Sequence, residues 1–331
     1  MCIRDSLNPL LQNFWMVAHP PVVFMGYAAY TMPFALAIAG LITKQLNREW
    51  LRAVRRWALW AWLFLGAGIL MGAWWAYLEL GWGGYWGWDP VENSSLIPWL
   101  TGTALLHSLM MQQRRKTFKT WTLWLIALTF ALCLFATFVT RSGIIQSVHA
   151  FGRSPIGYYF LAFIALCLLA LALLISLRRQ GLGKAYEFQA LLSRETSLLL
   201  TNLLLLGAAL VVLIGTLFPA LLELFQGQQA ALDVAFYERT VGPLVLSTIA
   251  LVGVCPWLAW GGKSTSRLRR VLLPAALIAL VVSIVLFVTG IRQFGALLAF
   301  FVCIFVGVSL VMIFYRGTVD RRSRTGEGIP Q

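Results

Sequence analysis

The sequence has little charge and long apolar segments. Of its 331 residues only 11% are charged and 60% are hydrophobic, whereas a soluble globular chain is about a quarter charged. This composition excludes a soluble globular protein. The apolar runs are continuous, which also excludes a transmembrane β-barrel, because the strands of such a barrel alternate between lipid-facing and lumen-facing residues.

Cysteine chemistry is scarce as well. Cys133, Cys167, Cys255 and Cys303 lie singly inside apolar segments, Cys2 lies near the N-terminus, and there is no C-x-x-C motif. We expect these residues to act as small buried apolar side chains and not in thiol–disulfide chemistry.

Apolar segments long enough to cross a bilayer, about 20 residues each, recur along the whole chain. They predict an all-α fold, a polytopic transmembrane helical bundle of about nine spans. The predicted spans lie near residues 21–43, 57–80, 96–112, 120–140, 157–177, 197–218, 241–260, 271–290 and 294–315.

The net charge of +14 comes from basic residues grouped in alternate loops. Five of the 26 Lys and Arg residues lie in the N-terminal segment and in the loops after even-numbered spans, and the other 21 lie after odd-numbered spans. The five are Arg4, Arg141, Arg153, Arg239 and Arg292. By the positive-inside rule, the N-terminus, residues 81–95, 141–156 and 219–240 and the short turn near Arg292 face the outside. The charge therefore indicates topology and lipid contact, and not nucleic-acid binding.

The first residues of the chain do not resemble a native leader. Residues 1–6 have no apolar core, and no cleavable signal peptide precedes the first span. Because an outward N-terminus requires an earlier span, we interpret the chain as an internal piece of a longer protein and residues 1–6 as a candidate non-native leader.

Residues 82–93 combine aromatic side chains with glycine, in the order Trp-Gly-Gly-Tyr-Trp-Gly-Trp-Asp-Pro-Val-Glu-Asn. An interfacial aromatic belt is the simpler interpretation, but belt tryptophans are scattered singly among spans. The density here favours a platform for a large planar ligand. At the end of the run we expect Asp89 to cap a helix, Pro90 to begin it and Glu92 to close a capping box, which accounts for both acids without catalysis.

The chain has three histidines, His19, His107 and His149. His19 precedes Pro20 and Pro21, which we expect to delay the first helix and hold the imidazole at the outer edge of the bilayer. Alone, His19 or His149 would be an ordinary surface residue. Together, on the side that carries the tryptophans, they are candidate axial ligands of one haem iron.

His107 lies within the third predicted span, about 17 Å along the helix axis from Leu96. A neutral imidazole satisfied between helices is one interpretation. The other is a ligand of a second haem, since ionisable residues at this depth are functional candidates. Its partner ligand would lie outside this chain, because no other histidine has a comparable depth.

The run 82–93, with His19-Pro20-Pro21 before it and residues 147–151 after it, closely resembles the CcmF family of cytochrome c maturation proteins. These proteins handle haem and carry a tryptophan-rich WWD domain. The strings at residues 7–12, 104–108, 140–143 and 215–219 extend the resemblance over nearly the whole chain.

The resemblance implies roles for individual residues. His19 and His149 would be the axial ligands of the haem being delivered, and His107 one of two ligands of a permanent b-type haem. The residues that match the WWD platform are Trp82, Gly83, Gly84, Trp86, Trp88, Asp89, Pro90, Glu92 and Asn93.

Departures from the family pattern qualify this picture. Tyr85 and Gly87 stand where further large aromatics are usual, which implies a smaller platform. The family's second intramembrane histidine would follow Gln331, so we expect this chain alone to show little stable b-haem. Residues 7–177 would then form the haem-handling membrane region, and residues 178–331 would add further helices.

The implied function is that of a cytochrome c haem lyase component that acts in a complex. Haem would arrive from a CcmE-like haem chaperone and be joined to the C-x-x-C-H motif of an apocytochrome c that CcmH/CcmI-like subunits present. The b-haem, with quinol as electron donor, would reduce the incoming haem. No catalytic acid or base is assigned.

Other functions remain open at this point. A haem exporter would need an inward-facing ligand set, which the cytoplasmic loops do not offer. A paralogous nitrite-reductase-type lyase for a C-x-x-C-K site is not separated by the sequence. A small-solute transporter is disfavoured, because the spans lack paired interrupted helices.

Overall fold

The computed structural model describes residues 12–81, 83–115, 118–145, 147, 149, 155–182, 190–227, 232–262 and 265–325. All regular secondary structure within these ranges is helical, as the fold prediction requires. The long helices are α1 (Phe14–Ala29), α2 (Thr31–Thr43), α3 (Arg48–Glu79), α4 (Pro90–Arg115), α5 (Lys119–Ser142), α6 (Ile156–Arg178), α7 (Arg194–Gln226), α8 (Val234–Val254), α9 (Thr265–Val288) and α10 (Phe294–Thr325). Short 3-10 turns follow α6 and α8.

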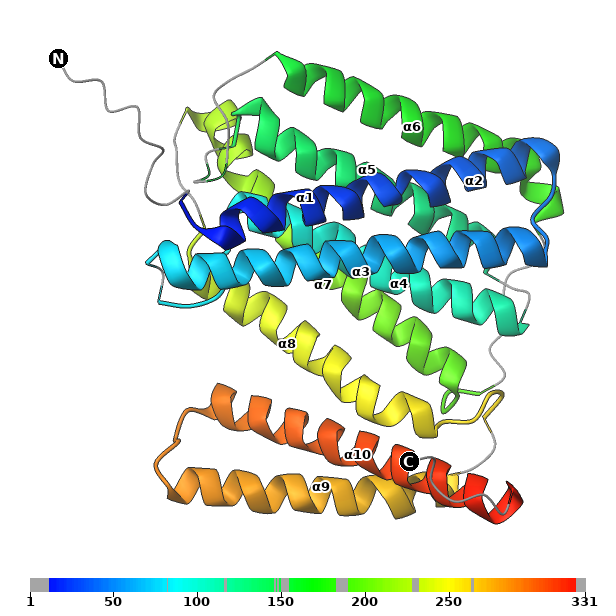
Figure 1. Ribbon diagram of the computed structural model, residues 1–331, viewed down its shortest axis with the longest axis vertical. Helices are drawn as coiled ribbons and strands as arrows, with labels where there is room; N and C mark the ends of the chain where they lie inside the picture. The colour runs from blue at the N-terminus through cyan, green and yellow to red at the C-terminus, as the bar shows by residue number, and fades with distance from the viewer. Residues whose placement is uncertain are drawn as a thin grey trace. The chain divides into compact units, whose positions relative to one another are not determined.

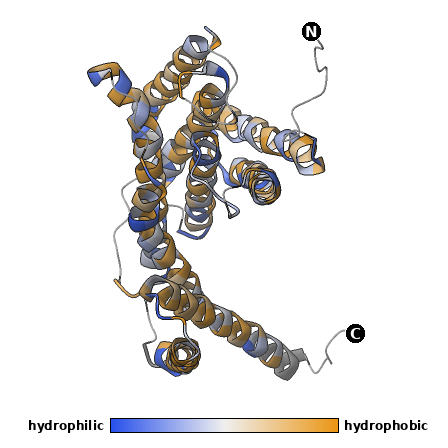
Figure 2. Ribbon diagram, turned by 90° about the vertical axis from the view of Figure 1, so that its left-hand side faces the viewer, coloured by the Kyte–Doolittle hydropathy of each residue, from blue (hydrophilic) through white to orange (hydrophobic). Residues whose placement is uncertain are grey.

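Eight segments of the described chain are long and apolar enough to cross a membrane, and apolar residues cover most of their length (Figure 2). They correspond to eight of the nine predicted spans, with α1 and α2 forming one segment. The remaining predicted span, residues 96–112, corresponds to α4, which is also a long helix but is less apolar. It buries Asn93, Ser108 and Gln112 against its neighbours, and a helix enclosed by protein does not need an apolar surface all round.

The helices divide into two compact units. The first comprises residues up to 186 together with 205–241, and the second comprises 187–204 together with 242–331. The sequence also predicts a functional boundary at residue 177. A division by packing does not test it, so it stays a prediction.

In the first unit α1 packs against α3, α3 against α4, α4 against α5 and α5 against α6 (Figure 1). Two glycines let α1 and α3 approach closely. A Cβ at Gly26 would lie 2.6 Å from the backbone nitrogen of Leu65, and one at Gly68 would lie 2.7 Å from that of Val23. A larger residue at either position would separate the two helices, and α1 carries His19.

The prediction that Pro20 and Pro21 delay the first helix is wrong. Helix α1 begins at Phe14 and contains both prolines. Its start is fixed by Asn13, whose side chain accepts from the Trp15 amide at 2.8 Å and donates to Glu79 at 2.7 Å. This N-cap and the packing on α3 outweigh the loss of backbone donors at the prolines. His19 is therefore part of a helix and not of an extended segment before it.

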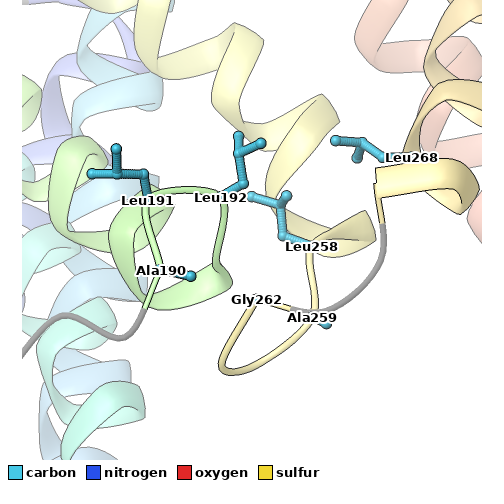
Figure 3. Close-up of a pocket in the computed structure, with 7 residues that line it drawn as sticks. All are labelled: Ala190, Leu191, Leu192, Leu258, Ala259, Gly262 and Leu268. Atoms are coloured by element: carbon cyan, nitrogen blue, oxygen red, sulfur yellow. The ribbon is translucent and has the colours of Figure 1, made fainter.

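In the second unit α9 and α10 pair as a hairpin (Figure 1). Ser309 of α10 donates to the Gly253 carbonyl at 2.6 Å and accepts from the Trp257 indole at 2.8 Å. This unit also has an open hollow of about 360 Å³ (Figure 3). Its lining residues are Ala190, Leu191, Leu192, Leu258, Ala259, Gly262 and Leu268. None of these side chains is polar, so the hollow offers no ligand for haem iron.

Candidate functional site

Most of the candidate residues, but not His107, lie at one end of the first unit. This end contains the start of α1, the end of α3, the start of α4 and the end of α5, at the left of Figure 1. His19 lies on the second turn of α1, and His149 lies after α5. Both imidazoles contact Trp75 of α3.

The start of α4 is capped as the sequence predicts. Asp89 Oδ2 accepts from the Val91 amide at 3.0 Å. In return Glu92 Oε2 accepts from the Asp89 amide at 3.2 Å and also from the Gly87 amide at 3.0 Å. The capping box is therefore confirmed, and it fixes the direction in which the glycine-rich loop enters the helix.

Asp89 has a second role that the capping argument does not contain. Its Oδ2 atom lies 3.0 Å from Nδ1 of His149 and accepts from the Ser147 hydroxyl at 2.5 Å. The Ser147 hydroxyl in turn accepts from the His149 amide at 3.0 Å. Three hydrogen bonds thus form a closed ring that joins the loop after α5 to the first residue before α4.

His19 is held differently. Its Nδ1 atom lies 2.8 Å from the carbonyl oxygen of Trp15, one turn earlier on the same helix. The ring stacks on Trp75 with centroids 5.5 Å apart and planes 23° apart. Gly72, one turn before Trp75, leaves room for it, since a Cβ there would lie 3.3 Å from Cδ2 of His19.

The partners of the two Nδ1 atoms define the tautomer of both rings. A backbone carbonyl and a carboxylate only accept hydrogen bonds, so Nδ1 must carry the proton in each imidazole. In the neutral form the lone pair of His19 and of His149 is then on Nε2. This is the arrangement in which a histidine coordinates a metal ion through Nε2 while its other nitrogen is held by an outer partner.

Trp75 is the shared contact of the two rings. The His149 ring meets it edge-on, with centroids 5.3 Å apart and planes at 69°, and the indole is only 3% exposed. The two imidazoles therefore lie close together, although 130 residues separate them in the sequence. Sequence reasoning did not identify Trp75, and the adjacent tryptophans Trp74 and Trp75 near the end of a span were the signal available.

The two acids at the start of α4 have opposite pKa shifts. Burial acts to raise the pKa of Asp89, but the hydrogen bonds from His149, Ser147 and Val91 outweigh it and leave that pKa below its usual value. Burial raises the pKa of Glu92 to about 7, against the opposing effect of the two backbone amides that it accepts from. Asp89 is thus ionised at neutral pH, where Glu92 is about half protonated.

The tryptophan loop, which we define as the described residues 83–89 before α4, does not form one flat surface. The rings of Trp86 and Trp88 stand at 87° to each other, with centroids 6.1 Å apart. Trp88 has a positive φ of 56° and stacks on Tyr237 of α8, with centroids 4.7 Å apart and planes within 6°. Asn93, which is fully buried, donates to the Trp88 carbonyl at 3.0 Å and holds this bend. Trp82 lies outside the described residues.

Tyr85 belongs to a separate aromatic group. It stacks on Tyr77 of α3 with centroids 4.4 Å apart and lies 5.8 Å from the ring of Trp74. All three are about half-exposed. Gly83 and Gly84 have no atoms near the position of an added Cβ, so space alone does not require glycine at either position.

Comparisons with known proteins identify the family of the chain. The model of the family "Cytochrome C assembly protein" matches residues 2–146. The CcmF protein of Pseudomonas aeruginosa is 41% identical over 327 residues, which cover 97% of this chain and 49% of that protein. The CcmF protein of Escherichia coli is 43% identical over 284 residues, which cover 86% and 44%. A solved structure, "Cytochrome c Heme Lyase CcmF", superposes with a TM-score of 0.75 at 33% identity and covers 94% of this chain and 47% of its own.

The chain belongs to the CcmF family. It is a multi-pass inner-membrane protein, and its relatives are named for cytochrome c-type biogenesis. The chain spans about half the length of the curated relatives it matches. The NrfE protein of Haemophilus influenzae, also named for cytochrome c-type biogenesis, is 38% identical over 83% of the chain.

His107 is not part of the site at the start of α4. It is half-buried on the same helix, roughly 27 Å along the axis from Asp89 at 1.5 Å per residue. Among the described residues no group of three or more His, Cys, Asp or Glu side chains is arranged to hold a metal ion. The rings of His19 and His149 share a contact with Trp75, and the roles of all three histidines as haem ligands stay predictions.

Proposed function

We propose that this region of a CcmF-family protein holds haem at the outer face of the membrane between His19 and His149 while the haem is joined covalently to the C-x-x-C-H motif of an apocytochrome c. Haem is the substrate in this reaction. The proposal extends the family's biogenesis role to particular residues of this chain.

One observation carries the proposal most directly. The two imidazoles contact the same indole from different elements, and each has its Nδ1 atom on an acceptor. Both Nε2 atoms therefore keep their lone pairs, and two neutral imidazoles fill the two axial positions of a haem iron.

The chain's contribution to the reaction is orientation. The helix of His19 and the Asp89 contact of His149 fix the two rings, and both rings pack against the buried Trp75. Holding the substrate at one face makes attack by the two cysteine thiols effectively unimolecular. The thiols and the vinyl groups supply the reactivity, and no residue is assigned as catalytic acid or base.

A b-type haem is the second cofactor in the proposal. Its role would be to pass electrons, with quinol as donor, to the incoming haem. His107 would supply one axial nitrogen. The chain has three histidines, and two of them belong to the outer pair, so its own histidines do not complete a bis-histidine site.

The orientation and the partners follow from the same proposal. The loops at the His19 end carry few basic residues, which supports a periplasmic position by the positive-inside rule. A CcmE-like haem chaperone would deliver haem there. CcmH/CcmI-like subunits would present the reduced apocytochrome to the same side.

The test uses the full-length protein in cells that make a c-type cytochrome. We expect His19→Ala and His149→Ala each to abolish covalent haem attachment, measured as haem-stained holocytochrome. Thr43→Ala, an exposed residue at the end of α2, is the control. Normal holocytochrome yield in both histidine variants would refute the axial pair.

A haem exporter is distinguished by the direction of haem movement. An exporter would release haem to the outside in the absence of apocytochrome, whereas the proposed lyase component would retain it. The relatives named CcmF are slightly more similar than NrfE, so we place the C-x-x-C-H substrate before a C-x-x-C-K substrate. Supplying both apocytochromes to the same cells tests that order.

A further inference from the structure

We propose that Asp89 is a positioning residue for His149: its carboxylate fixes which imidazole nitrogen carries the proton and ties the loop that holds His149 to the start of α4. The inference rests on the proposed function, in which His149 binds the iron of the substrate haem. It assigns Asp89 a role that the helix cap does not explain.

The contact between the two side chains is close and sheltered. Nδ1 of His149 lies 3.0 Å from Oδ2 of Asp89, and the side chains are 14% and 9% exposed. Because a carboxylate has no proton to donate, it selects the tautomer with hydrogen on Nδ1. In a polar contact largely shielded from water this selection is stronger than at an open surface.

The Ser147 hydroxyl makes the contact directional. It donates to Asp89 Oδ2 and accepts from the backbone amide of His149. The carboxylate is therefore bonded to both the side chain and, through Ser147, the backbone of the same residue. If the His149 ring rotated away from Asp89, the bond between Nδ1 and the carboxylate would break, but the bonds of Ser147 would stay in place. Ser147 alone therefore does not fix the orientation of the ring.

His19 provides the contrast. Its Nδ1 atom is bonded to the carbonyl of Trp15 within its own helix, so its tautomer depends on the helix and not on a distant side chain. Asp89 is 60 residues from His149 in the sequence. A carboxylate partner also makes an imidazole a stronger electron donor to a metal than a neutral carbonyl does. The two axial ligands are therefore unequal, and His149 is the stronger donor.

The cap and the positioning role are separable by one substitution. Asparagine caps helices about as well as aspartate, so Asp89→Asn should keep the bond to the Val91 amide and the start of α4. One atom, Asp89 Oδ2, accepts from Val91, Ser147 and His149. The amide oxygen that keeps the cap therefore also keeps the Nδ1–H tautomer, and the variant removes only the negative charge. Removing the negative charge lowers the donor strength of His149.

Asp233 is a matched control. It precedes α8 as Asp89 precedes α4, and its Oδ1 atom accepts from the Phe236 amide at 2.9 Å. Asp233→Asn therefore makes the same chemical change at another helix start, where no histidine is involved.

The experiment uses full-length protein in nanodiscs. In the haem-free state, ¹⁵N chemical shifts of labelled histidine, assigned by comparison with His149→Gln, report the tautomer. We expect the Nδ1–H form in the wild type and in both asparagine variants, because an amide oxygen in place of Oδ2 also only accepts. The Nε2–H form in the wild type would overturn the inference. With haem supplied, Asp89→Asn should weaken haem retention by about 10- to 100-fold and raise the reduction potential of the haem that remains. Ser147→Ala, which leaves the cap intact, should weaken retention by a smaller factor.

The outcomes separate this inference from the proposed function. If His149→Ala loses haem and holocytochrome while Asp89→Asn keeps the wild-type haem retention and reduction potential, Asp89 is only a cap and the inference is overturned. If His149→Ala keeps both, the axial pair itself fails. Should Asp89→Asn unfold, unchanged haem retention and tautomer in Ser147→Ala would overturn the inference instead.

Discussion

The ionisation of Glu92 makes the stability of the first unit depend on pH. Glutamine at this position does not ionise, so Glu92→Gln should remove this dependence. In the folded protein burial raises the pKa of this carboxyl from 4.5 to about 7. Between these two pH values the folded state binds one more proton than the unfolded state. The free energy of unfolding therefore falls as pH rises through the window.

The size of the effect follows from the shift. Each pKa unit corresponds to about 1.4 kcal/mol, so ionised Glu92 costs about 3 kcal/mol at a pH above 7 relative to a pH below 4.5. The lowered pKa of Asp89 acts with the opposite sign. The stability it contributes is present above its unfolded value of 3.8 and is lost as pH falls below it. The two windows do not overlap.

The substitution is Glu92→Gln, whose amide oxygen can still accept from the Gly87 and Asp89 amides. Thermal unfolding in detergent at several pH values between 4.5 and 7.5 should show that the midpoint of the wild type decreases relative to that of Glu92→Gln as pH rises. Glu49→Gln, an exposed glutamate in the first turn of α3, should keep the wild-type slope. Parallel profiles for the wild type and Glu92→Gln would refute the argument.

Two further changes test the packing beneath the site. Gly26→Ala places a Cβ against the Leu65 backbone and should lower the free energy of unfolding by about 1–3 kcal/mol. At Gly307 no atom lies within 4 Å of an added Cβ, so Gly307→Ala should raise the free energy of unfolding by up to about 1 kcal/mol. Equal melting temperatures for the two variants would contradict the close approach of α1 and α3. Trp75→Ala removes a buried indole, so it should lower the free energy of unfolding by about 3–5 kcal/mol and weaken haem retention. Trp75→Phe keeps an aromatic ring against both histidines and should retain more haem. Identical haem spectra for the two variants would show that the ring is not required.

The spans and the cap could be predicted because their information is local. A run of about 20 apolar residues identifies a membrane helix without reference to the rest of the chain. The order of Asp89, Pro90 and Glu92 identifies a helix start in the same way. The first helix was misplaced for the same reason, since a local rule about Pro20 and Pro21 omits the packing of α1 on α3 and the bond from Asn13 to Glu79.

The contacts that define the site are not local. Nothing in the spacing of the sequence indicates that Asp89 meets His149 or that Trp75 contacts both His149 and His19. Sequence reasoning brought the two histidines to one side of the membrane by counting charges, which fixes a side and not a distance. It also treated the tryptophans as a flat platform, whereas Trp88 turns toward Tyr237.

The tryptophan loop therefore supports the site through the backbone as well as through its rings. Asn93 holds the Trp88 carbonyl, and the bend at Trp88 brings Asp89 to the start of α4. Asp89 in turn holds His149. A substitution that straightens this loop would move the carboxylate first and His149 with it, while His19, bonded within its own helix, would stay in place. Loss of the loop's conformation should thus remove one axial ligand and spare the other, which a loop that only supplied a flat surface would not do.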